Sequence, residues 1–284
     1  AGLAAFVASR ALATPPIPSG ELVIDVLDTG QGDCTLVTFP DGRHWLVDGG
    51  GTAQERIGAD HLVPVLRNLG VRRLDTVVVT HPDADHTAGL RDIVAAFGAQ
   101  QVFDNGRGNE ADADWWGLMT ALRQRHIPVR RAPDICGIHA VGDVQVEVLH
   151  PCAPEMPFDP PLSANDSSIV LRLSHHHRRV LLTGDLGHPG EQILLSRGAL
   201  LSADVLKLGH HGSAGSSSGA LLNAVSPSSA IASCGEGNLW KFPAGVVQNR
   251  LSERRIRLLR TDLQGAIRVR IFNSGIRIGP SAAP

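Results

Sequence analysis

Residues 81–86 of this chain read HPDADH, which places four potential metal ligands within six positions. The preceding stretch, residues 74–80, reads LDTVVVT, and such a β-branched apolar run is typical of a buried strand. Several ionisable groups at the end of a buried strand cost free energy unless an opposite charge compensates them. A bound divalent cation is the usual compensation, so this stretch predicts a metal site.

Two later segments have the same layout, an apolar strand followed directly by ligand-type side chains. Residues 181–185 read LLTGD and end in Asp185, and residues 206–213 read LKLGHHGS and contain the pair His210 and His211. Because α/β folds place their sites at the ends of strands, we expect the three segments to converge. Asp185 would then bridge two ions, and His210 would complete the second.

The ligand chemistry predicts a dinuclear centre. An extended turn sends alternate side chains to opposite sides, so we expect residues 81 and 83 to face one ion and residues 85 and 86 the other. The predicted ligands are His81, Asp83, Asp85, His86, Asp185 and His210. Because half of them are carboxylates, Mn²⁺ is favoured over Zn²⁺, and Mg²⁺ is also suitable. The first ion has few ligands, so we expect it to bind weakly, with Asn165 or Asp166 adding an oxygen.

Length and composition fit a soluble α/β protein of 284 residues with a formal net charge of −2. This charge does not require a polyanionic partner, so any nucleic acid must meet a local patch. Four widely spaced cysteines form no CxxC pair, which argues against a cysteine zinc site. Whether Cys136 and Cys152 pair is left open by the sequence, and so is the redox compartment.

Hydrophobic periodicity predicts two groups of strands, each followed by alternating helices. The expected strands are residues 22–27, 34–39, 45–47, 76–79, 144–149, 169–173, 180–182, 205–208, 230–233 and 266–271. The expected helices are residues 54–69, 87–97, 115–126, 191–196, 218–225 and 245–254. The recurrence of the pattern predicts two sheets with helices on their outer faces. The histidine run at 175–177 lies between two strands, so we interpret it as a hairpin tip rather than a metal tract.

The first 20 residues are expected to form a tail, and residues 21–284 a single hydrolase domain. Residues 1–13 are apolar and rich in small side chains, but they are too few to span a bilayer. Three interpretations remain: the end of a transmembrane helix, the end of a signal peptide, or an unstructured terminus.

Taken together, the motifs resemble a known family. HPDADH, TGD and HHGS, in that order and spacing, resemble the metallo-β-lactamase fold superfamily, and more narrowly the hydrolase domain of the ComEC competence-protein family. Residues 28–33 (DTGQGD), 46–50 (LVDGG) and 165–168 (NDSS) match further motifs of that domain, and the similarity extends from about residue 21 to 271. It implies a four-layer αββα sandwich with the site between the edges of the sheets.

The resemblance also implies an activity. It implies a two-metal phosphodiesterase that cleaves DNA, preferably single-stranded, during uptake through a membrane channel built by other segments of the same parent chain. Such a domain is associated with the cell membrane on its extracytoplasmic face and uses no small-molecule cofactor. We expect Asp185 and His211 to be catalytic, with His211 orienting water or protonating the leaving oxygen. The residues expected to contact substrate are Asn165, Ser168, Ser213 and Asn238.

Two departures from the family pattern keep alternatives open. Asp83 replaces the middle histidine of the usual HxHxDH motif, and Phe242 and Ala244 flank Pro243 where the family carries histidine. One alternative is another two-metal hydrolase, such as a phosphorylcholine esterase or a lactamase-like enzyme. The other is a DNA-guiding module with little or no catalytic activity.

Overall fold

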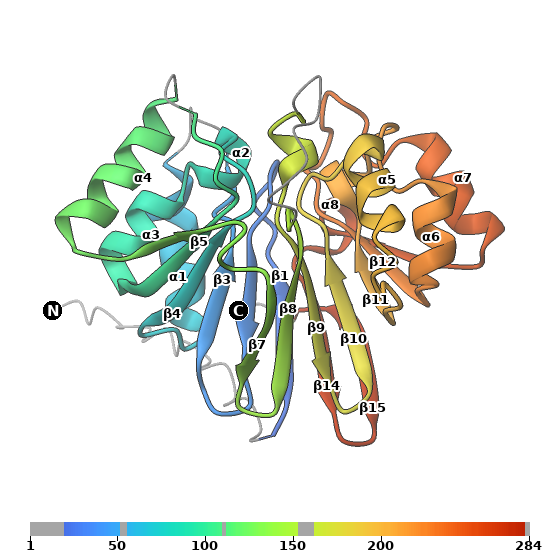
Figure 1. Cartoon of the computed structure of the whole chain (residues 1–284), viewed down its shortest axis with the longest axis horizontal. Helices are drawn as coiled ribbons and strands as arrows, with labels where there is room; N and C mark the ends of the chain where they lie inside the picture. Colours follow the sequence, from blue (N-terminus) through green and yellow to red (C-terminus); the bar gives the residue numbers. More distant parts are fainter. Residues whose placement is uncertain (1–19, 52–55, 110–111, 153–161, 282–284) are drawn as a thin grey trace, which may run out of the picture.

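A computed structural model of the chain describes residues 20–51, 56–109, 112–152 and 162–281. Two sheets pack face to face, and helices cover the outer face of each sheet (Figure 1). The predicted αββα sandwich is therefore confirmed. Residues 1–19 of the expected tail, which was predicted to end at residue 20, lie outside the described residues. Within the described ranges, no helix has both the length and the apolar character needed to cross a membrane.

The first sheet has the strand order β15-β14-β1-β2-β3-β4-β5-β6. Pairing is antiparallel from β15 to β3 and parallel from β3 to β6. Its strands are β1 (Leu22–Val26), β2 (Thr35–Thr38), β3 (His44–Val47), β4 (Leu74–Val79), β5 (Ala99–Asp104), β6 (Val129–Arg131), β14 (Ile267–Phe272) and β15 (Gly275–Pro280).

The second sheet has the order β13-β12-β11-β10-β9-β8-β7 and repeats this division into halves. Pairing is antiparallel from β7 to β10 and parallel from β10 to β13. Its strands are β7 (Gly137–Val141), β8 (Val144–His150), β9 (Val170–His175), β10 (Arg178–Leu182), β11 (Val205–Lys207), β12 (Ser229–Ala232) and β13 (Arg257–Arg260). The carboxyl ends of β4, β10 and β11 point to the same end of the sandwich (Figure 1).

The helical segments connect the strands and form the two outer layers. They are η1 (Gly58–Leu62), α1 (Val63–Asn68), α2 (Ala84–Thr87), α3 (Leu90–Phe97), α4 (Ala113–Gln124), η2 (Asn165–Ser167), α5 (His188–Ser196), η3 (Gly209–Gly212), α6 (Gly219–Val225), α7 (Gly245–Glu253) and α8 (Thr261–Gln264). In Figure 1, α1, α3 and α4 lie over the first sheet, and α5, α6 and α7 lie over the second.

Three apolar clusters account for the layers. One fills the space between the sheets and includes Phe39, Val78 and Leu182. A second joins the first sheet to its helices, and a third does the same for the second sheet. The alternation along β14, where every second residue is buried, shows how a strand contributes one face to the middle cluster.

The structure corrects several predicted boundaries. The predicted helix 54–69 begins as a π-helical turn and continues as α1, while residues 52–55 lie outside the described residues. The helix predicted from residue 87 is split: α2 already begins at Ala84, and α3 starts at Leu90. Five strands, β5, β6, β7, β13 and β15, were not predicted, because polar or glycine residues interrupt their apolar pattern.

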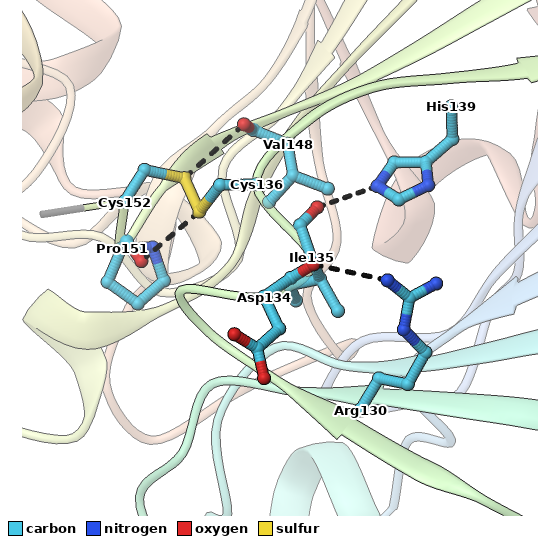
Figure 2. Close-up of a disulfide and its surroundings, with 8 residues drawn as sticks. All are labelled: Arg130, Asp134, Ile135, Cys136, His139, Val148, Pro151 and Cys152. Atoms are coloured by element: carbon cyan, nitrogen blue, oxygen red, sulfur yellow. Dashed lines mark hydrogen bonds between the residues drawn. A yellow bond between two sulfur atoms is a disulfide. The ribbon is translucent and has the colours of Figure 1, made fainter. Parts of the chain in front are cut away.

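A disulfide closes the open end of the β7–β8 hairpin. Cys136 precedes β7 and Cys152 follows β8, and the two are joined across a sequence separation of 16 residues (Figure 2). The pairing that the sequence left open is thus present in the structure. The other two cysteines, Cys34 and Cys234, are buried and free.

Candidate metal centre

Four side chains from three segments converge at the strand ends. Asp85 and His86 belong to α2, Asp185 follows β10, and His211 lies in η3 after β11. Each offers a ligand atom, and these atoms all lie within 4.8 Å of one another. His86 Nε2 lies 3.2 Å from Asp185 Oδ1, and His211 Nε2 lies 3.3 Å from Asp85 Oδ2 and 3.5 Å from Asp185 Oδ2. The predicted convergence is therefore present.

His81 and Asp83 also lie near Asp185. His81 Nε2 is 3.5 Å from Asp83 Oδ2 and 4.0 Å from Asp185 Oδ2. Asp185 consequently faces His86 with one oxygen and both His81 and His211 with the other. This central position is the one that the bridging role predicted for Asp185 requires.

The buried polar atoms of this cluster fit a cation. His81 Nε2, His86 Nε2 and Asp185 Oδ1 are buried, and none has a hydrogen-bond partner among the described residues. Buried polar atoms are normally paired, so a group of orphaned ligand atoms around one point is a sign of an ion site. Carboxylate oxygens and imidazole nitrogens together suit a divalent transition metal such as Mn²⁺.

The geometry of the histidine pair favours His211 over His210 as a ligand. The sequence assigned His210 as a ligand and His211 as the proton donor, whereas His211 belongs to the cluster with a side chain only 1% exposed. His210 is 38% exposed, and its Nε2 lies 3.8 Å from Asp185 Oδ2. The reason is the backbone: both residues have positive φ, 47° and 55°, so the simple continuation of strand alternation fails after β11.

The turn of α2 is also tighter than the extended loop that the sequence suggested. Asp83 is extended and caps the helix, whereas Asp85 and His86 are helical. The backbone N–H of Asp33 donates to Asp85 O at 3.1 Å, and that of Gly49 donates to His86 O at 2.7 Å. At Gly32 a β-carbon would lie 2.1 Å from Asp85 O, and φ is +109°, so only glycine permits this close approach.

A second layer of side chains orients the ligands. Asp48 Oδ2 accepts a hydrogen bond from His86 Nδ1 at 2.8 Å, and Thr80 donates to the same carboxylate through its backbone N–H at 2.8 Å and its hydroxyl at 2.7 Å. The Thr80 hydroxyl oxygen also lies 3.1 Å from His81 Nδ1. His211 Nδ1 lies 3.0 Å from the carbonyl oxygen of Ser233. Such partners fix the tautomer and orientation of ligating histidines.

The carboxylates and imidazoles of the centre shift one another's pKa. Burial would raise the pKa of Asp185, but His211 and His86 outweigh it and hold that pKa well below its ordinary value. Burial lowers the pKa of His211, yet the carboxylates of Asp185 and Asp33 raise it to about 10. Asp33 in turn forms a buried ion pair with Lys207. A metal ion that binds His211 must therefore displace a proton.

Two of the four residues predicted to contact substrate, Ser168 and Asn238, have their polar groups engaged within the protein. Ser168 is fully buried, and its hydroxyl accepts a hydrogen bond from the Asp185 backbone N–H at 3.0 Å, so it positions a ligand instead of contacting substrate. The Asn238 amide is used within its own loop, bonding Gly235 and Phe242. These two predictions need correction, because a buried or fully used group is not available to substrate.

Asn165 begins η2, and Ser213 directly follows η3 with a side chain 8% exposed. Both therefore lie on segments next to the centre, and their predicted contact with substrate stays a prediction. Asp166, the other oxygen donor considered for the first ion, accepts hydrogen bonds from the backbone of Gly187 and Gly190 at the start of α5. Asn165 is thus the candidate that remains.

Sequence reasoning did not single out the supporting residues Thr80, Lys207 and His150. Thr80 and Lys207 are polar side chains within otherwise apolar strand segments, and that pattern was the available signal. His150 ends β8 in a buried position, and its Nε2 donates to the carbonyl of Asp166 at 2.8 Å. Burial lowers the pKa of His150 to about 4, so this histidine is neutral at ordinary pH.

An aromatic column extends from the centre to the surface. The Phe242 ring is stacked on His211 with 6.1 Å between centroids and 25° between planes. Trp240 is stacked on Phe242 at 6.3 Å and 16°, and it is 59% exposed. Neighbouring Leu239 is 90% exposed. The column offers a flat apolar surface that leads to a candidate ligand.

Comparisons with known proteins agree with this geometry. The model of the Metallo-beta-lactamase superfamily matches residues 27–236. The chain is 36% identical over 282 residues to Competence protein ComA of Neisseria gonorrhoeae, which covers 97% of this chain and 36% of that protein. It is 33% identical over 271 residues to ComE operon protein 3 of Bacillus subtilis, covering 91% and 34%. The chain thus spans about a third of the length of these relatives.

Solved structures are similar in fold. A variant of CmlA beta-hydroxylase superposes with a TM-score of 0.52 at 15% identity, covering 90% of this chain and 55% of that chain. Zn²⁺-bound PqqB from Methylobacterium extorquens gives a TM-score of 0.50 at 10% identity, covering 84% and 97%. At these identities the likeness concerns the fold alone.

Proposed function

Because the chain belongs to the metallo-beta-lactamase superfamily, we propose that residues 21–284 form a metal-dependent phosphodiesterase that cleaves DNA during uptake. The observation that carries the proposal is the position of Asp185, which faces His81 and His86 of the HPDADH segment and His211 of η3. The DNA part is supported by the similarity to competence proteins.

The proposed centre would hold two divalent ions, with Asp185 within reach of both ligand sets. The proposed ligands of one ion are Asp85, His86, Asp185 and His211, and those of the other are His81, Asp83 and Asp185, with Asn165 as a further candidate. Three imidazoles and three carboxylates favour Mn²⁺, with Mg²⁺ and Zn²⁺ as competitors. When bound, such a pair polarises the phosphoryl oxygen and lowers the pKa of water.

The side chains around the ions have separate tasks. Asp48 and Thr80 hold the rings of His86 and His81, and Ser168 holds the backbone of Asp185. His210 is solvent-accessible at the margin of the centre, so we assign it the transfer of a proton to the leaving oxygen. This reverses the roles that the sequence suggested for the histidine pair.

The aromatic column supports a single-stranded substrate. Exposed aromatic rings bind unpaired bases of any sequence by stacking, and duplex DNA does not offer its base faces in this way. A base stacked on Trp240 would place its strand beside Phe242 and His211. Phe242 therefore stands where the family carries a histidine, and its ring continues the aromatic column. Stacking of DNA bases gives a function to this substitution, which had raised the alternative of a DNA-guiding module without catalytic activity.

The disulfide supports an extracytoplasmic position. Disulfides persist in oxidising compartments and are rare in the cytosol, and Cys136 and Cys152 are paired in the structure. We propose that the domain lies on the outer side of the cell membrane, attached through other segments of its parent chain. The length of the competence relatives leaves room for such segments.

The decisive experiment compares cleavage of single-stranded and duplex DNA by the wild type, Asp185→Asn and Asp204→Asn. Each protein is assayed with Mn²⁺ and with a chelator. Asp204 directly precedes β11 and pairs with Arg178, so its variant controls for the loss of one carboxylate. We expect Mn²⁺-dependent cleavage by the wild type and Asp204→Asn, and at least a 10²-fold loss in Asp185→Asn.

Two further measurements on the same proteins, turnover of small substrates and affinity for DNA, separate the alternatives. Turnover of small phosphodiesters, phosphorylcholine esters or lactams, without DNA cleavage, would favour another two-metal hydrolase. Tight DNA binding without cleavage under any metal would favour a guiding module. Either result would overturn the proposed nuclease activity.

A further inference from the structure

A second cluster of metal-ligating side chains lies at the opposite end of the sandwich. Asp143 belongs to the tip of the β7–β8 hairpin, and His175 and His176 to the tip of the neighbouring β9–β10 hairpin. Each offers one ligand atom, and the three atoms lie within 4.8 Å of one another. Figure 1 shows that both tips point away from α2, so this cluster is separate from the catalytic centre.

The hydrogen bonds of His175 expose a mismatch that a cation would resolve. The ring is buried, and its Nε2 lies 3.2 Å from the carbonyl oxygen of Gly20. A carbonyl only accepts, so Nε2 carries the hydrogen and, in the neutral ring, Nδ1 is left with a lone pair. Nδ1 faces Asp143 Oδ2 at 3.8 Å. Two acceptors that face each other at this distance leave room for a bound cation between them, as in many metal sites where a carbonyl orients the ligating histidine.

The backbone of the tip gives independent support. His176 and His177 are the two central residues of the hairpin turn, and both have positive φ, 45° and 62°. Two-residue turns of this kind normally carry Asn-Gly, because larger side chains are strained there. Strained positions occupied by unfavourable residues often mark functional sites. His176 lies beside His175, with ring centroids 3.9 Å apart.

The nearby positive charge belongs to two arginines, Arg172 and Arg179. Arg172 lines the same surface hollow, but its guanidinium pairs with Glu147 and also donates to the carbonyl oxygen of Leu200. Gln145 and Ser174, which also line the hollow, are uncharged. Among the described residues, the Asp143 carboxylate forms an ion pair with neither Arg172 nor Arg179, and its charged-group partner is His175. It can therefore compensate a bound cation.

We propose that His175, His176 and Asp143 bind one transition-metal ion of the Zn²⁺ class. His175 would use Nδ1, and water would fill the open coordination position. Two imidazoles favour Zn²⁺, Ni²⁺ or Cu²⁺ over Mg²⁺ or Ca²⁺. The ion would link the two hairpin tips and, through the His175 ring, the backbone at Gly20 that leads into β1.

The chain offers a matched pair of variants for the test. His176→Asn removes a ligand, and His177→Asn removes its neighbour, which is outside the cluster; asparagine tolerates positive φ at both positions. The number of Zn²⁺ ions bound per chain is measured by equilibrium dialysis for the wild type and both variants. Circular dichroism in the presence of a chelator verifies that each variant is folded.

We expect His176→Asn to bind one Zn²⁺ ion fewer than the wild type, and His177→Asn to bind the same number. Asp143→Asn is a surface change that leaves the turn at His176 and His177 unaltered, and it should lower the affinity for the same Zn²⁺ ion at least tenfold. Asp185→Asn should retain it. The proposal is overturned if His176→Asn binds the full number of ions, or if His177→Asn loses as many ions as His176→Asn. If His176→Asn does not fold, unchanged Zn²⁺ binding by Asp143→Asn overturns it.

Discussion

The Asp48 carboxylate accepts a hydrogen bond from His86 Nδ1 at 2.8 Å, and this directs His86 Nε2 at Asp185. Asp48 has a φ of 61°, which asparagine tolerates, so Asp48→Asn removes the charge without straining the backbone. We expect the variant to bind Mn²⁺ about 10 to 100 times more weakly, because loss of such a partner reduces ligand basicity and order. Isothermal titration with Mn²⁺ measures this, and an unchanged affinity would contradict the assigned role.

His210 and His211 should respond differently to the same substitution. His211→Asn removes a buried ligand, so the chain should lose one ion. His210→Asn should keep both ions but lower the rate of DNA cleavage by about 10²-fold, as expected for loss of a general acid. Metal analysis and cleavage rates on the same samples test both statements. The opposite pattern would restore the roles suggested by the sequence.

Substitution of Trp240 should weaken the binding of single-stranded DNA and leave the hydrolysis of small substrates unchanged. Stacking of one base is worth about 1–3 kcal/mol, so Trp240→Ala should weaken binding of single-stranded oligonucleotides about tenfold or more. Hydrolysis of a small phosphodiester should be unchanged, because it does not reach the ring. Trp116→Ala is the control, since Trp116 is also exposed, at 47%, but lies on α4. Equal losses in both variants would exclude a specific stacking role.

The disulfide should contribute measurably to stability. Joining residues 16 apart is worth about 3 kcal/mol in the chain-entropy account. We expect the free energy of unfolding of Cys136→Ala/Cys152→Ala to be lower by about this amount in urea titrations. Reductant should destabilise the wild type and leave the double variant unchanged. A wild type insensitive to reductant would argue against the bond.

His150 should make stability depend on pH. Its pKa is lowered from 6.5 to about 4 in the folded chain, so the unfolded chain binds more protons between these values. The contribution of the neutral ring is complete above pH 6.5 and is lost as pH falls toward 4, up to about 3 kcal/mol. In His150→Gln this part of the pH dependence should disappear. Unfolding titrations from pH 4 to 7 compare the two proteins, and parallel curves would refute the assignment.

The sequence was sufficient to predict which strand ends carry candidate metal ligands, because each of them combines an apolar run with closely spaced aspartate or histidine residues. For this reason the sequence predicted that Asp185 and the HPDADH segment lie close together, and the structure brings them together. Their role as metal ligands stays a prediction. The choice between His210 and His211 was not accessible, because it depends on two residues with positive φ, which the sequence pattern does not encode. The resemblance to a known family supplied the fold as a whole.

The roles of the residues that support the candidate ligands could not be predicted from the sequence either. Ser168 and Asn238 carry polar groups that suit substrate binding equally well, and only burial and hydrogen bonds show that they serve Asp185 and a loop. Edge strands such as β15 were not predicted because only two isoleucines stand among its glycine, arginine and proline residues, which weakens the apolar signal. The hairpin tip at residues 176–177 was predicted correctly, since a polar run between two strands has few other solutions.

The arrangement of β14 beside β1 has a consequence for how this chain is made. β1 occupies the interior of its sheet only after β14, more than two hundred residues later, has paired with it. The centre likewise draws on α2 in one half and on Asp185 and His211 in the other. A ribosome that has released only the first half has therefore not yet produced the candidate metal centre, which forms only once both halves of the chain have folded together.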